Sequence, residues 1–154
     1  MSGTANIEGR LIIRIGPAQG QVGIESTRPL LASRLFEGNA IGEVLETIPL
    51  LFNVCGRAQS VAAIRAVESA QQTPATAPVE QGRSLLIQLE TLREHLWRVL
   101  LEWPEFHGQK RETVPLAGWM ADIQAINGLI DPGGRLCREP GLSEAAASSE
   151  DLQR

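Results

Sequence analysis

Apolar side chains in the middle of this chain recur at intervals of four and three residues. They are Leu85, Leu89, Leu92, Leu96, Val99 and Trp103. Because this spacing places side chains on one face of a helix, as in helical bundles, it predicts a long helix here. Pro104 is expected to end the helix, since proline lacks the N–H that an inner helical turn needs. We expect the stripe to be buried within a bundle; the alternative is a docking face for another protein.

Three other segments have helical patterns. The first has Asn39 as a plausible N-cap and Pro49 at its end, and the second is rich in alanine, which favours a helix that another helix can approach closely. The third begins with Pro115, a residue type common in the first helical turn. Prolines and threonines mark residues 71–82 as a linker. The predicted helices cover residues 39–49, 56–70 and 115–130.

The N-terminal part has the pattern of a β-hairpin. Residues 10–15 are a short β-type run, and residues 16–20 contain the glycines and proline of a turn. Residues 21–27 then alternate between polar and apolar side chains, as a strand with one packed face does. A hairpin alone is marginally stable in water, so this one is expected to pack against another part of the fold.

The predicted fold class is α+β, mainly α. An antiparallel hairpin at residues 10–27 precedes a bundle of about four helices between about residues 39 and 130. Residues 1–135 are expected to form one domain. Residues 136–154, which are rich in serine, alanine and glutamate, are expected to be a disordered tail.

The composition of the chain excludes several classes of function. With 154 residues and a net charge of −4, it has no basic footprint for nucleic acid. No apolar run reaches the roughly 18–20 residues of a membrane-spanning helix, and the N-terminus lacks the pattern of a secretion signal. We therefore expect a cytoplasmic protein that does not insert into membranes, in which Cys55 and Cys137 form no disulfide. Common enzyme motifs, such as a phosphate-binding loop, are absent from the sequence.

Residues 50–68 resemble the first metal-binding motif of nickel–iron hydrogenase large subunits, which reads roughly R-x-C-G-x-C-x-x-x-H. Cys55 stands at the second cysteine, and Gln59 replaces the histidine. Phe52 replaces the first cysteine and Leu50 the arginine. One thiolate remains where the enzymes have a pair, and a nickel–iron centre needs several soft sulfur ligands. The resemblance therefore implies a relative that is not an enzyme and carries no nickel–iron centre.

Other segments extend this resemblance over roughly residues 5–135. Residues 6–13 resemble the first strand of the large subunits, and Glu8 matches a glutamate that transfers protons in those enzymes. Residues 27–38, together with the Cys55 motif, resemble hydrogenase expression and formation proteins of the HupK/HoxV type. The run that ends at Cys137 lacks the spacing of the second hydrogenase motif, and we interpret it as coincidence.

The resemblance to the HupK/HoxV type implies a scaffold that carries or transfers the Fe(CN)2CO group to an immature hydrogenase large subunit. Cys55 is the expected metal ligand, because the positive end of a helix dipole favours a thiolate there. The alternative is that Cys55 is a small buried apolar residue. Expected partners are maturation chaperones and the immature large subunit; the alternative function is a metal-free protein that only docks on these partners.

Three further residues are candidates for binding the fragment. Glu8 can relay a proton to Cys55, Arg57 can steady an anionic cyanide-bearing group, and Gln59 can donate a hydrogen bond. Each has a plain alternative as a solvated surface side chain. His95 and His107 do not have the spacing of a metal site and are expected to be ordinary flank and loop residues.

Overall fold

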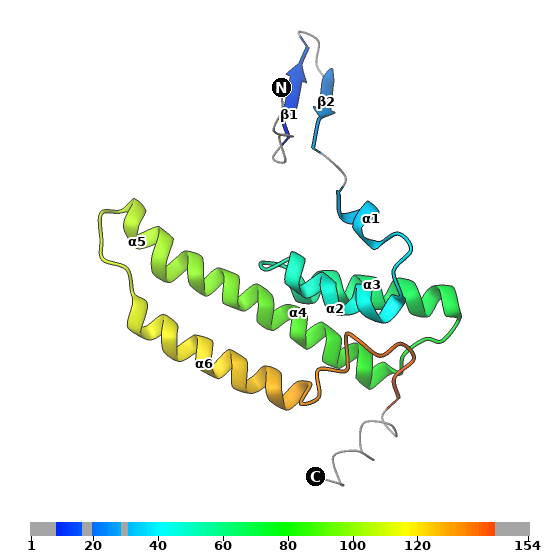
Figure 1. Cartoon of the computed structure of the whole chain (residues 1–154). Coiled ribbons are helices and arrows are strands. Elements are labelled where there is room, and N and C mark those ends of the chain that lie inside the picture. The colour runs from blue at the N-terminus through cyan, green and yellow to red at the C-terminus, as the bar shows by residue number, and fades with distance from the viewer. Residues whose placement is uncertain (1–8, 17–19, 29–30, 144–154) are drawn as a thin grey trace, which may run out of the picture. The chain divides into compact units, whose positions relative to one another are not determined.

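The computed structural model of the chain describes residues 9–16, 20–28 and 31–143, and it confirms the predicted α+β, mainly α fold class (Figure 1). The chain divides into two compact units, Met1–Asn39 and Ala40–Arg154. The first unit contains β1 (Leu11–Ile15), β2 (Val22–Ser26) and the short helix α1 (Leu31–Phe36). The second contains α2 (Ile41–Leu51), α3 (Gly56–Gln71), α4 (Ala77–Trp97), the π-helix η1 (Arg98–Glu102), α5 (Trp103–Phe106) and α6 (Thr113–Ile130).

The predicted hairpin is confirmed. β1 and β2 pair in antiparallel fashion with Ile13 opposite Ile24, so β-branched side chains are cross-strand neighbours. Gly9 precedes β1 with a φ of +65°, and a Cβ atom there would lie 2.5 Å from the Cα atom of Arg28. Only glycine fits such a close approach of two backbones. Glu8 lies outside the described residues.

Helix α3 begins where the sequence predicts it, but the N-cap of α2 is Ala40 and not Asn39, whose side chain donates to the carbonyl of Leu35 at 2.9 Å. Helix α2 also does not end at Pro49. The helix continues to Leu51, and the N–H of Phe52 still donates to the carbonyl of Ile48 at 3.1 Å. Proline is tolerated in this last turn because only its own missing N–H is lost. A Cβ atom on Gly56 would lie 3.3 Å from the Cα atom of Pro49, so glycine lets α3 begin close to α2.

The predicted linker at residues 71–82 is shorter in the structure. Gln72 has a left-handed φ of 56° and ends α3, and α4 already begins at Ala77. Pro78 lies in the first turn of α4, where its missing N–H has no intrahelical partner to lose. The prolines therefore mark a helix start and not an extended linker.

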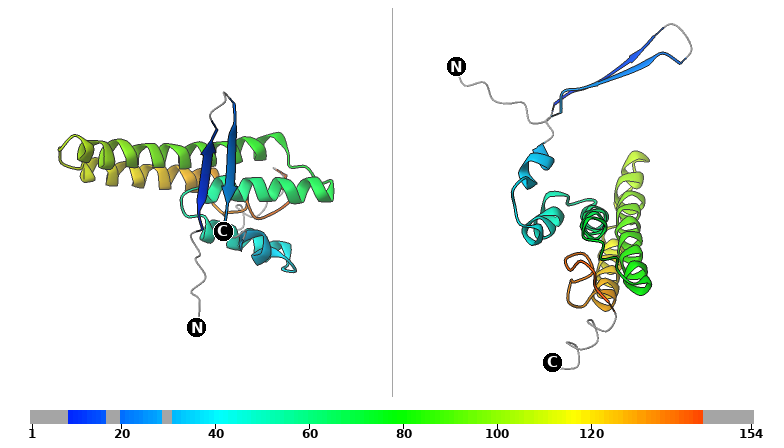
Figure 2. Two further views of the ribbon diagram at one scale, coloured as in Figure 1. Left: turned by 90° about the horizontal axis from the view of Figure 1, so that it is seen from above. Right: turned by 90° about the vertical axis from the view of Figure 1, so that its right-hand side faces the viewer.

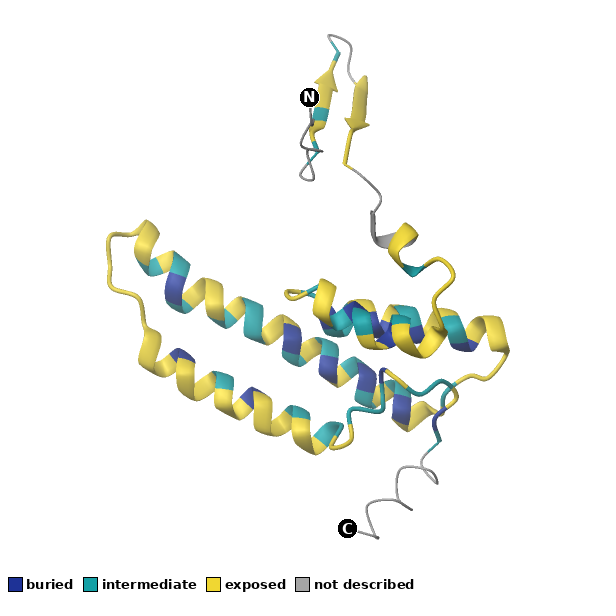
Figure 3. Ribbon diagram, in the orientation of Figure 1, coloured by how far each residue is buried: buried dark blue, intermediate teal, exposed yellow. Residues whose placement is uncertain are grey.

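The buried face of α4 is not the predicted leucine stripe. Leu85, Leu92, Val99 and Trp103 are exposed, whereas Val79, Arg83, Leu86 and Glu90 are buried. The true face contains two charged residues, so a pattern of apolar residues alone selects the neighbouring face. Figure 3 shows the buried positions along α3 and α4. The prediction that the stripe is buried is wrong.

Pro104 does not end the long helix. The N–H of Trp103 donates to the carbonyl of Arg98, the wider spacing of a π-helix, and α5 continues past the proline. The carbonyl of Leu100, which would have faced an N–H at Pro104 in a regular α-helix, accepts a hydrogen bond from the N–H of Glu112 at 2.8 Å. The widened turn and this outside donor together accommodate the proline within the helix.

Helix α6 runs alongside α4 in the opposite direction (Figures 1 and 2). Of the predicted apolar face of α6, Leu116 and Ile123 are buried, whereas Trp119 and Ile126 are exposed. Asp122 is the sole charged side chain in this helix. Among the helices that the structure describes, none is long and apolar enough to cross a membrane.

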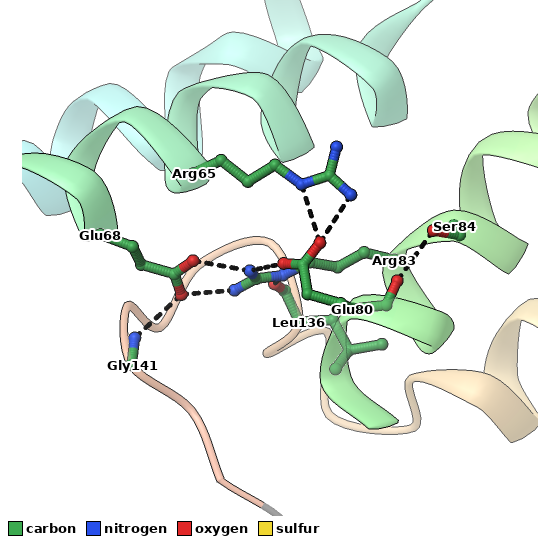
Figure 4. A network of polar contacts seen from close by, with 7 residues as sticks. All are labelled: Arg65, Glu68, Glu80, Arg83, Ser84, Leu136 and Gly141. Carbon is green, nitrogen blue, oxygen red and sulfur yellow. Dashed lines mark hydrogen bonds and ion pairs between the residues drawn. The ribbon is translucent and has the colours of Figure 1, made fainter. Parts of the chain in front are cut away.

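A segment after α6, residues 131–143, is held against α3 and α4 by a buried ion pair (Figure 4). Arg83 is 0% exposed, and its Nη1 and Nη2 atoms each donate to a carboxylate oxygen of Glu68 at 2.8 Å. Arg83 Nε donates to the carbonyl of Leu136 at 2.7 Å, and the N–H of Gly141 donates to Glu68 at 2.9 Å. Both members of the pair thus bond the backbone of the segment.

The docked segment corrects the predicted start of the disordered tail at residue 136. Cys137 and Leu142 are buried, and Cys137 packs with Val61 of α3 and Leu86 of α4. The sequence does not reveal this docking, because Arg83 and Glu68 bond the backbone of the segment and not its side chains. Residues 144–154 lie outside the described part of the chain.

The ion pair predicts a loss of stability in acid. Burial alone would raise the pKa of Glu68, but the hydrogen bonds from Arg83 and Gly141 outweigh it and hold the pKa below its ordinary value of 4.5. A carboxyl with a lowered folded pKa contributes stability above about pH 4.5, and this is lost as the pH falls through the lower folded value. We expect the urea unfolding midpoint to change little between neutral pH and about pH 5, to fall as the pH is lowered through and below 4.5, and to fall less in Glu68→Gln. An equal fall in both proteins would contradict this role of Glu68.

Candidate functional site

Cys55 is the last residue before α3 and lies in a short turn that follows α2. Its side chain is half-buried, and the adjoining Gly56 is buried against the end of α2. The thiol is therefore neither a core residue nor a freely mobile surface group. The thiol is not fully buried, so the sulfur is partly accessible to a small reagent or a ligand.

The N-terminus of α3 beside Cys55 is already bonded to a carboxylate. Glu90 of α4 accepts hydrogen bonds from the N–H groups of Arg57, at 2.7 Å, and Ala58, at 3.0 Å. A carboxylate at a helix N-terminus satisfies unpaired N–H groups and balances the positive end of the dipole. The carboxylate of Glu90 therefore opposes the effect of the helix dipole that was expected to favour a thiolate at Cys55.

A second residue of α4 bonds the other side of the same turn. Arg93 Nη2 donates to the carbonyl of Val54 at 3.2 Å and to the carbonyl of Asn53 at 3.4 Å. Its guanidinium is also paired with Glu94 at 2.9 Å. Side chains of α4 thus contact the backbone immediately before and immediately after Cys55.

The structure brings one of the three accessory candidates to the thiol. Gln59 Nε2 lies 4.0 Å from Cys55 Sγ, one helical turn along α3. The Arg57 side chain instead interacts with the thiol of Cys137. Glu8 belongs to the residues that the structure does not describe, so its role stays a prediction.

Cys137 lies in a different environment from Cys55. Burial raises the pKa of the Cys137 thiol, and the nearby carboxylate of Asp131 acts in the same direction. The positive charges of Arg57 and, more weakly, of Arg83 lower the pKa of this thiol without reversing the shift. The Cys137 thiol is therefore held protonated, which makes it a poor metal ligand in this conformation.

The run that resembles part of a second metal motif has a structural role here. The side chain of Asp131 accepts hydrogen bonds from the N–H groups of Arg135, at 2.8 Å, and Leu136, at 3.3 Å. Gly134 has a φ of +66° within this turn. Asp131 and the glycine therefore shape the turn that leads into the docked segment.

No group of three or more histidine, cysteine, aspartate or glutamate side chains that could hold a metal ion is present in the described part of the chain. A thiolate suits a soft, iron-containing group, and an amide such as Gln59 suits a cyanide that accepts hydrogen bonds.

The sequence analysis missed Glu90 and Arg93. Both are ordinary residue types for the exposed face of a long helix, and their partners lie more than 30 residues earlier in the chain. The signal that could have found Glu90 is its place among the buried positions Val79, Arg83 and Leu86, a spacing of four and three residues that includes charged side chains.

The chain is similar to proteins named hydrogenase expression/formation proteins. It is 41% identical over 99 residues to HupK of Azotobacter vinelandii, a match that covers 62% of this chain and 29% of the relative. It is 36% identical over 104 residues to HoxV of Cupriavidus necator, covering 68% of this chain and 26% of the relative. These matches confirm the predicted resemblance to the HupK/HoxV type. No protein-family profile and no solved structure matches the chain.

The match to HoxV includes the Cys55 turn. A match that covers 104 of the 154 residues includes the central residues, wherever it begins, and Cys55, Gln59 and Glu90 all lie there. The chain spans less than a third of the length of the relatives that it matches.

Proposed function

Because the chain is similar to hydrogenase expression/formation proteins of the HupK/HoxV type, we propose that it is a non-catalytic hydrogenase maturation factor. It holds the Fe(CN)2CO group, or passes it on, through the thiolate of Cys55. The observation that carries this proposal is the half-buried thiol in a turn that belongs to the region shared with HoxV. The iron fragment is the cargo of the protein and not a resident cofactor.

The residues around Cys55 suit such a cargo. The thiolate provides a soft ligand for iron, and the carbonyl and cyanide groups of the fragment occupy other coordination positions. Gln59 Nε2, already 4.0 Å from the sulfur, is placed to donate to a cyanide nitrogen. Arg57 would have to leave Cys137 before its guanidinium could serve the fragment.

The proposed partners follow from the same role. A single thiolate holds the fragment weakly enough to release it, so a donor that assembles the fragment and an acceptor that keeps it are both required. We assign these roles to maturation chaperones and to the immature hydrogenase large subunit, in the cytoplasm.

A metal-free docking protein is the second candidate, and the surface of α6 favours it. Trp119, Leu129 and Val114 are exposed on a helix with Asp122 as its sole charged residue. A helix that is apolar around most of its circumference is usually covered by another surface. Under this candidate the chain binds maturation partners and carries no iron.

Infrared spectroscopy of the protein purified without oxygen, from cells that contain the fragment-assembly machinery, tests the proposal. We expect cyanide and carbonyl stretches together with bound iron, and we expect both to be lost in Cys55→Ala and kept in Cys137→Ala. The second variant is a matched control, because it removes the buried thiol of the same chain. Bands that persist in Cys55→Ala contradict the ligand role. A protein without bands or iron, which still binds its partners, supports the docking function instead.

A further inference from the structure

We propose that Glu90 and Arg93 are positioning residues that clamp the turn containing Cys55 and fix the place of its thiol. The clamp serves the ligand role under "Proposed function", but its geometry and its test do not depend on bound iron. Both residues lie on α4, three positions apart, and so share one face of the helix. That face is directed at the turn between α2 and α3.

The contacts of the clamp are matched in charge to the backbone groups that they meet. The Glu90 carboxylate faces N–H donors at residues 57 and 58, and the Arg93 guanidinium faces carbonyl acceptors at residues 53 and 54. Hydrogen bonds that involve a charged group are stronger than neutral ones. The backbone is therefore held on both sides of Cys55, and the direction of its Cα–Cβ bond is fixed.

Burial supports the same conclusion for Glu90. Its side chain is 9% exposed, and a carboxylate this far from water is costly unless its oxygens are paired. Both oxygens bond the turn, Oε1 at 2.7 Å and Oε2 at 3.0 Å. Release of the turn would leave the buried carboxylate unpaired, so the contact is stabilising for both elements.

The hydrogen bonds of the clamp to the turn are to backbone groups. Substitutions of Val54 or Ala58 that keep the backbone conformation should therefore leave the thiol in place, whereas changes on α4 should move it. This separates positioning by α4 from any direct role of the neighbouring side chains in binding the fragment.

Thiol alkylation under native conditions tests the clamp, with mass spectrometry used to follow Cys55 and Cys137 separately. In Glu90→Gln the amide cannot accept both N–H groups, so the turn opens more often. We expect alkylation of Cys55 by iodoacetamide to be about tenfold faster, the effect of losing one charge-assisted hydrogen bond. Arg93→Met is expected to act in the same direction, and Glu46→Gln, which removes an exposed carboxylate from α2, is the control.

Cys137 distinguishes a local clamp from general loss of structure. Its thiol is buried with Val61 and Leu86, so its alkylation reports on opening of the helical unit or on release of the docked segment. The clamp is supported if the alkylation rate of Cys55 rises while that of Cys137 does not change. It is overturned if the alkylation rate of Cys55 is unchanged in both Glu90→Gln and Arg93→Met, or if the rates of the two cysteines rise together.

Infrared bands separate the failure of the clamp from the failure of the proposed function. If the clamp is right and the function wrong, alkylation of Cys55 changes although the unaltered protein shows no cyanide bands. If the function is right and the clamp wrong, the bands appear in the unaltered protein and persist in Glu90→Gln with unchanged alkylation.

Discussion

Replacing Arg83 with methionine is expected to lower the free energy of unfolding of the helical unit by about 3–5 kcal/mol, the usual cost of removing one partner of a buried ion pair. Methionine fills much of the same volume but leaves the buried carboxylate of Glu68 and the carbonyl of Leu136 without the guanidinium. The measurement is urea unfolding followed by far-ultraviolet circular dichroism at neutral pH. Since folded domains are stable by only about 5–15 kcal/mol, the variant should be visibly less stable.

Arg65→Met is the matched control for this prediction. Arg65 pairs with Glu80, which also contacts Arg83, but its side chain is largely in water. Exposed ion pairs contribute about 0–1 kcal/mol, so this variant should unfold close to the unaltered protein. Equal effects of the two substitutions would contradict the account of Arg83 as a buried anchor.

A double variant identifies the cause of the destabilisation. In Arg83→Met combined with Glu68→Leu, no unpaired charge remains between α3 and α4, and part of the stability should return. The docked segment should nevertheless stay loose, because the N–H of Gly141 and the carbonyl of Leu136 have both lost their partners. Alkylation of Cys137 measures that looseness directly. No recovery of stability would show that lost packing, and not the unpaired carboxylate, causes the effect.

Local sequence patterns were sufficient to predict the helices and strands that depend on neighbouring residues in the chain. The hairpin follows from alternation between residues 10 and 27, and the start of α3 follows from Gly56 and the alanines after it. The ends of helices were less predictable, since Pro49 and Pro104 each lie inside a helix. At Pro104, the carbonyl of Leu100 that loses its helical partner accepts a hydrogen bond from the N–H of Glu112, and no local sequence pattern reveals this contact.

Charged residues in the core explain the wrong face of α4. Arg83 and Glu90 are buried because their partners lie on α3, 15 and about 33 residues away in the chain. A sequence pattern that counts only apolar residues must assign such positions to the surface. The same pairs join α4 to the docked segment and to the Cys55 turn, so the feature that misled the prediction is what positions the candidate site.

The candidate site itself was predictable only in part. Cys55 and Gln59 were both found through a resemblance, Gln59 as the residue at the histidine position, and the structure places its amide 4.0 Å from the Cys55 sulfur. The clamp residues could not be found from the sequence, because they act on the backbone of a distant turn. Arg57 was expected beside Cys55, but its long side chain reaches Cys137 instead.

Two adjacent leucines allow the position of the buried face of α4 to be measured. Leu86 is 0% exposed and packs with Val61 and Cys137, whereas Leu85 is 47% exposed. We expect Leu86→Ala to lower the free energy of unfolding by about 2–5 kcal/mol, because it removes buried methyl groups and leaves a cavity. Leu85→Ala should change it by less than about 1 kcal/mol, as surface substitutions do.

The comparison is decisive because the two substitutions are chemically identical and lie in the same helix. Intrinsic helix propensity changes equally in both variants, so any difference between them reports on burial alone. Urea unfolding of the full chain measures it. If Leu85→Ala lowers the free energy of unfolding as much as Leu86→Ala does, the leucine stripe is covered in solution. The spacing of apolar residues then identifies the buried face correctly. If only Leu86→Ala is costly, the face that holds Arg83 and Glu90 is the core, and the stripe of Leu85 remains open to water.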